Sequence, residues 1–171
     1  MSKLILMGQL KHDDAGKKYI SFHTQSRQHL LPIVTDDDAA EGAWVRFSGK
    51  LHTQSIPEGD HYRKVWFGLG DLFPSEKGLY ANEFTVDGAT VVRVDNLRTT
   101  PLTLRKIVDF VVAEGDNYYN CIAFGRTAEK LIEKKHKKSL IWFSEAMFQS
   151  REYTKDGEQR TAYEVCVRDF V

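Results

Sequence analysis

One pattern occurs twice in this chain, and that repeat constrains the fold more than any other feature. Residues 44–73 and residues 140–171 each contain, in the same order, an aromatic-rich strand, a polar turn with glycine, a charged alternating strand, and Asp followed by apolar residues. Ser48 aligns with Glu145 at an offset of 145 − 48 = 97, and Asp71 aligns with Asp169 at an offset of 169 − 71 = 98. Because the units of solenoid proteins are shorter, at about 20–50 residues, this repeat indicates a duplicated domain.

The start of the pattern is repeated as well, at a shorter offset. Residues 4–10 resemble residues 91–97 at an offset of 91 − 4 = 87, which predicts 97 − 87 = 10 more residues between the first strand and the closing hairpin of the second copy. The turn-forming residues that follow Phe73 are typical of a linker. We therefore expect domains at residues 1–77 and 87–171, joined by a linker at residues 78–86.

The charge of the chain is balanced, with 24 Lys and Arg against 24 Asp and Glu in 171 residues. Neither half is a polycation, which argues against a histone-like DNA binder but leaves room for a local basic stripe. Residues 1–10 read as a strand rather than as a secretory signal or a membrane span, so we expect a cytoplasmic protein.

Neither the cysteines nor the histidines form a recognisable metal or catalytic motif. Cys121 and Cys166 lie in alternating apolar stretches without a Cys-x-x-Cys neighbour, which favours buried reduced thiols over a disulfide or a zinc site. The six histidines are scattered, and Asp36-Asp37-Asp38 lacks the Gly and the late Glu of an EF-hand loop. Because no nucleophile constellation or phosphate-binding loop occurs either, we predict a binding protein that is not an enzyme, without metal or cofactor.

Most of the chain alternates apolar and polar residues, as strands do. Glu114-Gly115-Asp116-Asn117 and Asp156-Gly157 have the composition of hairpin turns. The one predicted helix runs from about Arg126 to Lys137 and carries Ala128, Leu131 and Ile132 on its apolar stripe. The corresponding stretch of the first half, residues 35–42, reads as an acidic loop.

Five short strands in each half, with a helix between the third and fourth strands of the second half, predict an all-β protein. The predicted architecture is two tandem OB-folds, which are five-stranded, partly open Greek-key barrels. In this fold the face of strands two and three forms a groove for oligonucleotides or oligosaccharides, together with the loops joining strands one to two and four to five.

Three segments of the second half occur in an order that is familiar from one family. Residues 118–131 (YYNCIAFGRTAEKL), residues 147–165 and residues 94–101 resemble, respectively, the third strand and helix, the closing hairpin, and the first strand with its Pro-containing loop of the bacterial single-stranded DNA-binding protein (SSB) family. Residues 6–13 resemble the same first strand, so the first half is expected to be a shortened, diverged copy of the barrel. The resemblance implies binding of single-stranded DNA without strong sequence preference, in DNA replication, recombination or repair.

The resemblance also implies which residues contact DNA. It places the base-stacking aromatic residues of the family at Tyr118, Phe124 and Tyr153. Tyr118 and Phe124 are six residues apart on one predicted strand, so they point to the same face. Stacking contributes about 1–3 kcal/mol per base, and nearby cations neutralise phosphates. The cations predicted to do so are Arg105, Lys106, Arg126, Arg151, Lys155 and Arg160.

Aromatic residues also alternate with cations in the first half. Trp44 shares a strand face with two cations, and Tyr62, Lys64 and Trp66 share another. We expect Trp44, Lys64 and Trp66 to contribute to nucleic-acid binding. The alternative for both Trp residues, and for Trp142, is packing in the core or at a subunit interface.

The chain departs from the family pattern at three places. The loop at residues 114–117 is short, Ala146 replaces a usual Gly, and no acidic tail follows Val171, so recruitment of partners by a tail is not expected. The cations at residues 134–138 are interpreted as a solvated helix end that complements the helix dipole.

Because members of the family usually present four barrels per assembly, two barrels in one chain imply a homodimer. The alternative function is that of a protein-interaction module, akin to primosomal relatives of the family, with little DNA binding of its own. An oligosaccharide or tRNA binder is a third option that the fold permits, and the choice between DNA and RNA stays open.

Overall fold

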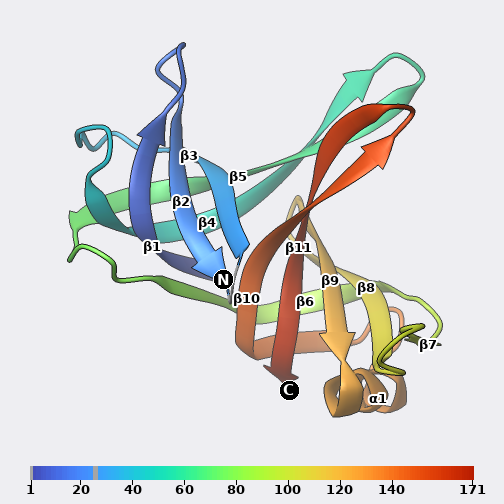
Figure 1. Ribbon diagram of the computed structural model, residues 1–171. Coiled ribbons are helices and arrows are strands. Elements are labelled where there is room, and N and C mark those ends of the chain that lie inside the picture. The colour runs from blue at the N-terminus through green and yellow to red at the C-terminus, as the bar shows by residue number, and fades with distance from the viewer. Residues whose placement is uncertain (1, 25–26) are drawn as a thin grey trace. The chain divides into compact units, whose positions relative to one another are not determined.

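The computed structural model describes residues 2–24 and 27–171, which form two β-barrels (Figure 1). The chain divides into two compact units, Ser2–Glu83 and Phe84–Val171. Residues 81–86, which belong to the linker expected from the sequence, lie in strand β6 (Ala81–Val94), so the boundary between the units falls inside a strand. Among the described residues, no helix has the length and apolar character needed to cross a membrane.

The first barrel is closed by a parallel pair of strands. β1 pairs with β2 and with β4, β2 pairs with β3, and β4 pairs with β5, all antiparallel, while β3 and β5 run parallel. The strands are β1 (Ser2–His12), β2 (Lys18–Thr24), β3 (Arg27–Val34), β4 (Trp44–Glu58) and β5 (His61–Pro74).

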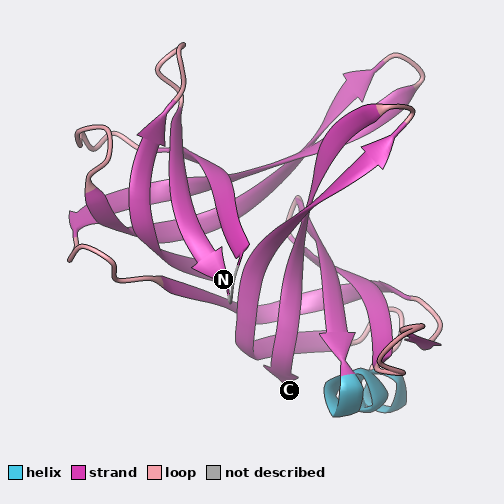
Figure 2. Ribbon diagram, viewed as in Figure 1, coloured by secondary structure: helices cyan, strands magenta, loops and turns pink. Residues whose placement is uncertain are grey.

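The second barrel repeats this order and adds a helix (Figure 2). β6 pairs with β8 and β10, β8 with β9, and β10 with β11, all antiparallel, and β9 runs parallel to β11. The prediction of two tandem OB-folds, with one helix between the third and fourth strands of the second, is confirmed. The further elements are β7 (Arg98–Thr99), β8 (Lys106–Glu114), β9 (Asn117–Phe124), α1 (Gly125–Lys134), β10 (Leu140–Lys155) and β11 (Glu158–Phe170).

The helix is shorter than the sequence predicts and buries a narrower stripe. α1 ends at Lys134, and Lys135 is already extended. Ala128 and Leu131 are buried, as predicted, but Ile132 is 42% exposed. The buried stripe of this ten-residue helix therefore consists of Ala128 and Leu131, and Ile132 faces away from the core.

Apolar side chains at alternate positions of the strands fill the core of each barrel. Phe22 and Phe47 are fully buried in the first barrel. In the second, Tyr119 is fully buried and meets Phe84 edge to face, with ring centroids 5.2 Å apart. Because successive side chains of a strand point to opposite faces, the neighbours of Tyr119 along β9 point outward.

The strand register corrects the offset of the first repeat. Leu10 of β1 and Leu31 of β3 pair with the same residue of β2, which lies between these strands. Val91 of β6 and Tyr119 of β9 likewise pair with the same residue of β8. All four side chains are buried in their cores. Leu10 is therefore equivalent to Val91, at an offset of 91 − 10 = 81, and the offset of 87 is wrong. A short apolar strand fits more than one register in an alignment, because only its pairing partners fix it.

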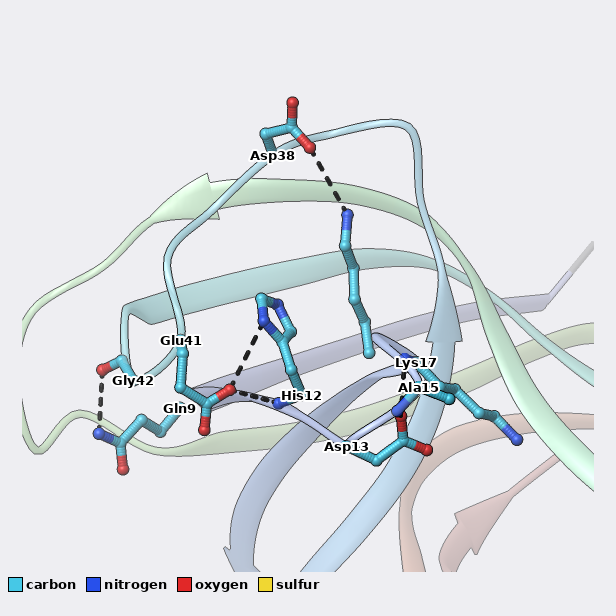
Figure 3. Close-up of polar contacts among 9 residues, drawn as sticks. Gln9, His12, Asp13, Ala15, Lys17, Asp38, Glu41 and Gly42 are labelled. Atoms are coloured by element: carbon cyan, nitrogen blue, oxygen red, sulfur yellow. Dashed lines mark hydrogen bonds and ion pairs between the residues drawn. The ribbon is translucent and has the colours of Figure 1, made fainter.

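In the first barrel a loop at residues 35–43 stands between the third and fourth strands, where the second barrel has α1. Figure 3 shows that side chains attach this loop to the end of β1. The Glu41 carboxylate accepts a hydrogen bond from the His12 backbone N–H, and Gln9 Nε2 donates to the Gly42 carbonyl at 2.9 Å. The loop is therefore held by β1 in place of a helix.

Candidate nucleic-acid interface

β9 divides its side chains between the core and the outer face of the second barrel. Tyr119 and Ala123 are fully buried in the core. Tyr118 and Phe124 alternate with them and lie on the outer face, where Tyr118 is 46% exposed and Phe124 is half-buried. The two rings therefore share a face, as their six-residue spacing predicts.

Phe124 packs on an apolar strip that crosses three strands of the outer face. The strip consists of Ile107 on β8, Ile122 on β9 and Cys166 on β11, all of them buried. Ile107 is the cross-strand partner of Phe124, and Cys166 is the partner of Ile122. The strip supports the Phe124 ring from below and fixes its position.

Arg105 lies over the Phe124 ring, with its guanidinium carbon 4.4 Å from the ring centroid. Two hydrogen bonds hold the Arg105 backbone: its N–H donates to Thr100 Oγ1, and its carbonyl accepts from the Thr100 N–H, both at 2.9 Å. The Leu104 N–H also donates to the Thr100 carbonyl, at 3.0 Å. The loop between β7 and β8 thus positions a cation on the ring, which is a favourable cation–π geometry.

The β10–β11 hairpin extends past the barrel (Figure 1). Its register places four of the predicted residues on one face. Tyr153 pairs across the hairpin with Arg160. Arg151 and Lys155 are each two residues from Tyr153, so they point to the same side. Tyr153 is 39% exposed, and three cations surround it.

β11 connects this hairpin face to the strip under Phe124. Cys166 lies on the strip, and Glu164 and Arg160 follow on the same side of β11 at even spacing. Glu164 accepts a hydrogen bond from Gln149 Nε2 at 2.9 Å and lies 3.9 Å from Arg151 Nε. Tyr118, Phe124 and Tyr153 therefore lie on one outer face of the second barrel.

Two predicted cations lie at the end of the barrel that α1 covers. Lys106 points to the same side of β8 as the core residue Val108, and its ammonium group forms an ion pair with Glu129 of α1. The hydrogen bond from Lys106 lowers the pKa of the Glu129 carboxyl. Arg126, exposed in the first turn of α1, lowers it further. Lys106 therefore points to the opposite side of β8 from Ile107 of the strip.

Sequence reasoning missed one cation of the outer face. Arg168 is exposed on β11, two residues beyond Cys166 and on the same side. Its positive charge acts on the Cys166 thiol, whose pKa is nonetheless raised because burial disfavours the thiolate. Strand alternation could have predicted this position, because Arg168 is two residues from Cys166 and so shares its side of β11.

The two tryptophans of the first barrel that were predicted to stack on bases do not form an exposed platform. Trp66 is 3% exposed and pairs with Thr53 on the core side of β4, so its expected role as a stacking ring is corrected. Lys64 lies above it, with Nζ 5.9 Å from the ring centroid. Trp44 is half-buried and packs edge to face on Tyr80, with centroids 5.4 Å apart.

The cysteines and the acidic loop, which from the sequence alone are candidates for a metal or redox site, have structural roles. Cys121 and Cys166 are buried free thiols, as predicted. The described residues contain no group of three or more His, Cys, Asp or Glu that could hold a metal. In the acidic loop, Asp37 Oδ2 accepts a hydrogen bond from the Leu72 N–H at 2.8 Å, and Asp38 lies 3.9 Å from Lys18 Nζ.

No protein-family model matches the chain, and no curated protein sequence matches it. Its fold belongs to the class of tandem OB-fold proteins and is similar to two crystal structures of the single-stranded DNA-binding protein from Thermus aquaticus. The wild-type structure has a TM-score of 0.69 at 14% identity, over 100% of this chain and 92% of that chain. A deletion variant has a TM-score of 0.70 at 14% identity, over 100% and 93%. At 14% identity the likeness shows the fold alone.

Proposed function

We propose that this protein binds single-stranded DNA along the outer face of its second barrel. The observation that carries the proposal is that strand alternation gathers Tyr118, Phe124 and Tyr153 on one face. Every base has a π-face, so rings in this arrangement stack on successive bases without reading their sequence. The fold shared with the Thermus aquaticus protein supports the same function.

Cations along this face supply the sites for phosphates. Arg151, Lys155 and Arg160 surround Tyr153, and Arg168 lies beyond the apolar strip. Carboxylates partner some of them, as Glu158 does for Arg160 at 3.5 Å. Exposed ion pairs of this kind contribute about 0–1 kcal/mol, so a phosphate displaces the carboxylate at small cost. Release of counterions from the DNA then favours binding.

Arg105 has two roles in this scheme. In the free protein its guanidinium occupies the face of Phe124 that a base would use. A base that stacks on Phe124 takes the place of the guanidinium, which remains within reach of the neighbouring phosphate. Arg105 therefore keeps the ring covered when DNA is absent and contributes charge when DNA is bound.

The biological role that we propose is protection and presentation of single strands in DNA replication, recombination or repair. We propose binding rather than catalysis, because the outer face offers stacking surfaces and cations, and the fold is that of a binding protein.

Titration with fluorescein-labelled oligo(dT) of increasing length, followed by fluorescence anisotropy, tests the proposal. We expect binding that weakens with salt, and a loss of about tenfold in affinity for Tyr118→Ala and for Tyr153→Ala, since each removes one stacked base. Tyr62→Ala is the matched control, because Tyr62 is an exposed tyrosine of the first barrel. Absence of binding at low salt, or full affinity in both variants of the second barrel, would contradict the proposal and favour an interaction module.

We also propose that the first barrel mediates a homodimer. Leu30 and Val34 of β3 and Leu69 of β5 are exposed on its outer face, and Val34 is the cross-strand partner of Leu69. Such an aliphatic patch is typical of a subunit interface. Analytical ultracentrifugation of Leu69→Asp should show the monomer mass, while Leu102→Asp, on an exposed loop of the second barrel, should retain the dimer. A wild-type monomer would refute the dimer.

A further inference from the structure

We propose that a groove on the second barrel binds an acidic peptide segment of another protein, one that also carries large aliphatic side chains. The groove has a volume of about 610 Å³ and lies between the end of β6, the outer side of β8 and the C-terminal end of α1. Its lining contains none of the aromatic residues assigned to DNA, so the inference is independent of the proposed function.

The floor of the groove is aliphatic. Val92 and Val94 of β6, Val111 of β8 and Ile132 of α1 line it. Ile132 is 42% exposed here, although it follows the buried Leu131 on a helix whose other apolar residues face the core. An apolar side chain of a partner that packed on this floor would remove the apolar surface of the floor from water, which favours binding.

The rim of the groove is positively charged. Arg93 Nε lies 2.9 Å from Asp95 Oδ1, so these two charges compensate each other. Lys135 and Lys137 then remain as net positive charges, with His136 between them. Lys135 Nζ donates to the Leu140 carbonyl at 2.6 Å, which fixes its position without neutralising it. A partner that complements this rim carries carboxylates.

A peptide fits the groove better than a nucleic acid does. The lining has no Phe, Tyr or Trp on which a base could stack, and its apolar surface is made of branched aliphatic side chains. Single-stranded nucleic acid is held by aromatic platforms together with cations. An aliphatic floor inside a cationic rim instead matches aliphatic side chains interspersed with carboxylates.

Fluorescence anisotropy with a labelled ten-residue peptide of alternating Asp and Leu tests the inference on the full chain. We expect this peptide to bind at least tenfold more tightly than an all-Asp peptide of equal length. Ile132→Asp and Lys137→Glu should each weaken it about tenfold, while their matched controls, Leu102→Asp and Lys155→Glu, should not. Oligo(dT) affinity should fall for Lys155→Glu and stay unchanged for Ile132→Asp, which separates failure of this inference from failure of DNA binding.

Three outcomes would overturn the inference. Equal affinity for the all-Asp peptide would show a general attraction of charge without a groove. Competition between unlabelled oligo(dT) and the peptide, with both weakened by Lys137→Glu, would assign the groove to nucleic acid. Absence of peptide binding at low salt would leave the groove without this partner.

Discussion

The two barrels have the same strand topology, and each has its own apolar core, but their outer faces differ. Ile33 pairs with Gly68 in the first barrel, and Cys121 pairs with Val165 in the second, so β3 and β9 correspond at an offset of 121 − 33 = 88. Tyr118 is then equivalent to Leu30, since 118 − 30 = 88. Both are nearly half exposed, one as an aromatic ring and the other as an aliphatic chain.

The closing hairpins differ in the same way. Glu58 pairs with His61 next to the first turn, and Lys155 pairs with Glu158 next to the second, which gives an offset of 155 − 58 = 97. At this offset Arg151, Tyr153 and Lys155 of the second hairpin stand where the first has Gln54, Ile56 and Glu58.

Equivalent strands of the two barrels thus differ in the side chains that they expose. Core positions are constrained by packing in both copies, whereas an exposed position changes at little cost to stability. The second barrel exposes Tyr118 and Tyr153 among cations, whereas the first exposes the aliphatic side chains Leu30 and Leu69 together with the ring of Phe73, over which Arg46 lies.

The largest effect is expected when the outer-face residues of the second hairpin are replaced by those of the first. The triple variant Arg151→Gln, Tyr153→Ile, Lys155→Glu loses one stacked base and two phosphate contacts, so its Kd for oligo(dT) should rise about a hundredfold. Because all three side chains are exposed, the melting temperature should stay near that of the wild type. An unchanged Kd with an intact fold would remove the hairpin from the site.

The reciprocal exchange should produce a smaller gain. Gln54→Arg, Ile56→Tyr and Glu58→Lys together place a ring and two cations on the first hairpin, and they also release Arg63, which lies 3.4 Å from Glu58. We expect affinity for long oligo(dT) to rise about tenfold and the site size to lengthen. No gain would mean that the first hairpin lies off the path of the DNA.

A still smaller effect is expected on the salt dependence of DNA affinity, which should differ between variants of the two outer faces. Lys155→Ala removes one phosphate contact, so the slope of log K against log salt should decrease in magnitude by about 0.7. Lys50→Ala, at an exposed position on β4 of the first barrel, should leave the slope unchanged. Fluorescence anisotropy titrations between low and moderate salt measure both slopes. Equal slopes for the two variants would contradict the assignment of the DNA site to the second barrel.

The sequence predicts those parts of the molecule that depend on neighbouring residues. The turn at Asp156-Gly157 forms as predicted, because both residues adopt the positive φ values, 54° and 78°, that such a hairpin requires. The alternation along β9 also predicts that Tyr118 and Tyr119 point to opposite faces and that Tyr118 and Phe124 share one, since a strand has a period of two.

Features that depend on distant residues were not predictable in this way. β5 is apolar on both sides, so alternation alone does not decide whether Trp66 or Phe67 faces the core. The pairing of Trp66 with Thr53 decides it, and Gly68 is a hint, because a Cβ there would lie 2.8 Å from the Phe47 ring. The cover that Arg105 places on Phe124 depends on hydrogen bonds within a loop that has no repeating pattern.

The smallest effect expected is a difference in reactivity between the two thiols, and it locates the DNA on the second barrel. Cys166 lies on the outer strip beneath Phe124, and burial raises its pKa, so alkylation by iodoacetamide at neutral pH should be slow. Cys121 points into the core and should react more slowly still, because the barrel must open first. If bound DNA stacks on Phe124, oligo(dT) should slow the alkylation of Cys166 severalfold and leave Cys121 unaffected. Mass spectrometry of each modified peptide measures both rates, and a Cys166 rate that does not respond to oligo(dT) would show that the strand runs elsewhere.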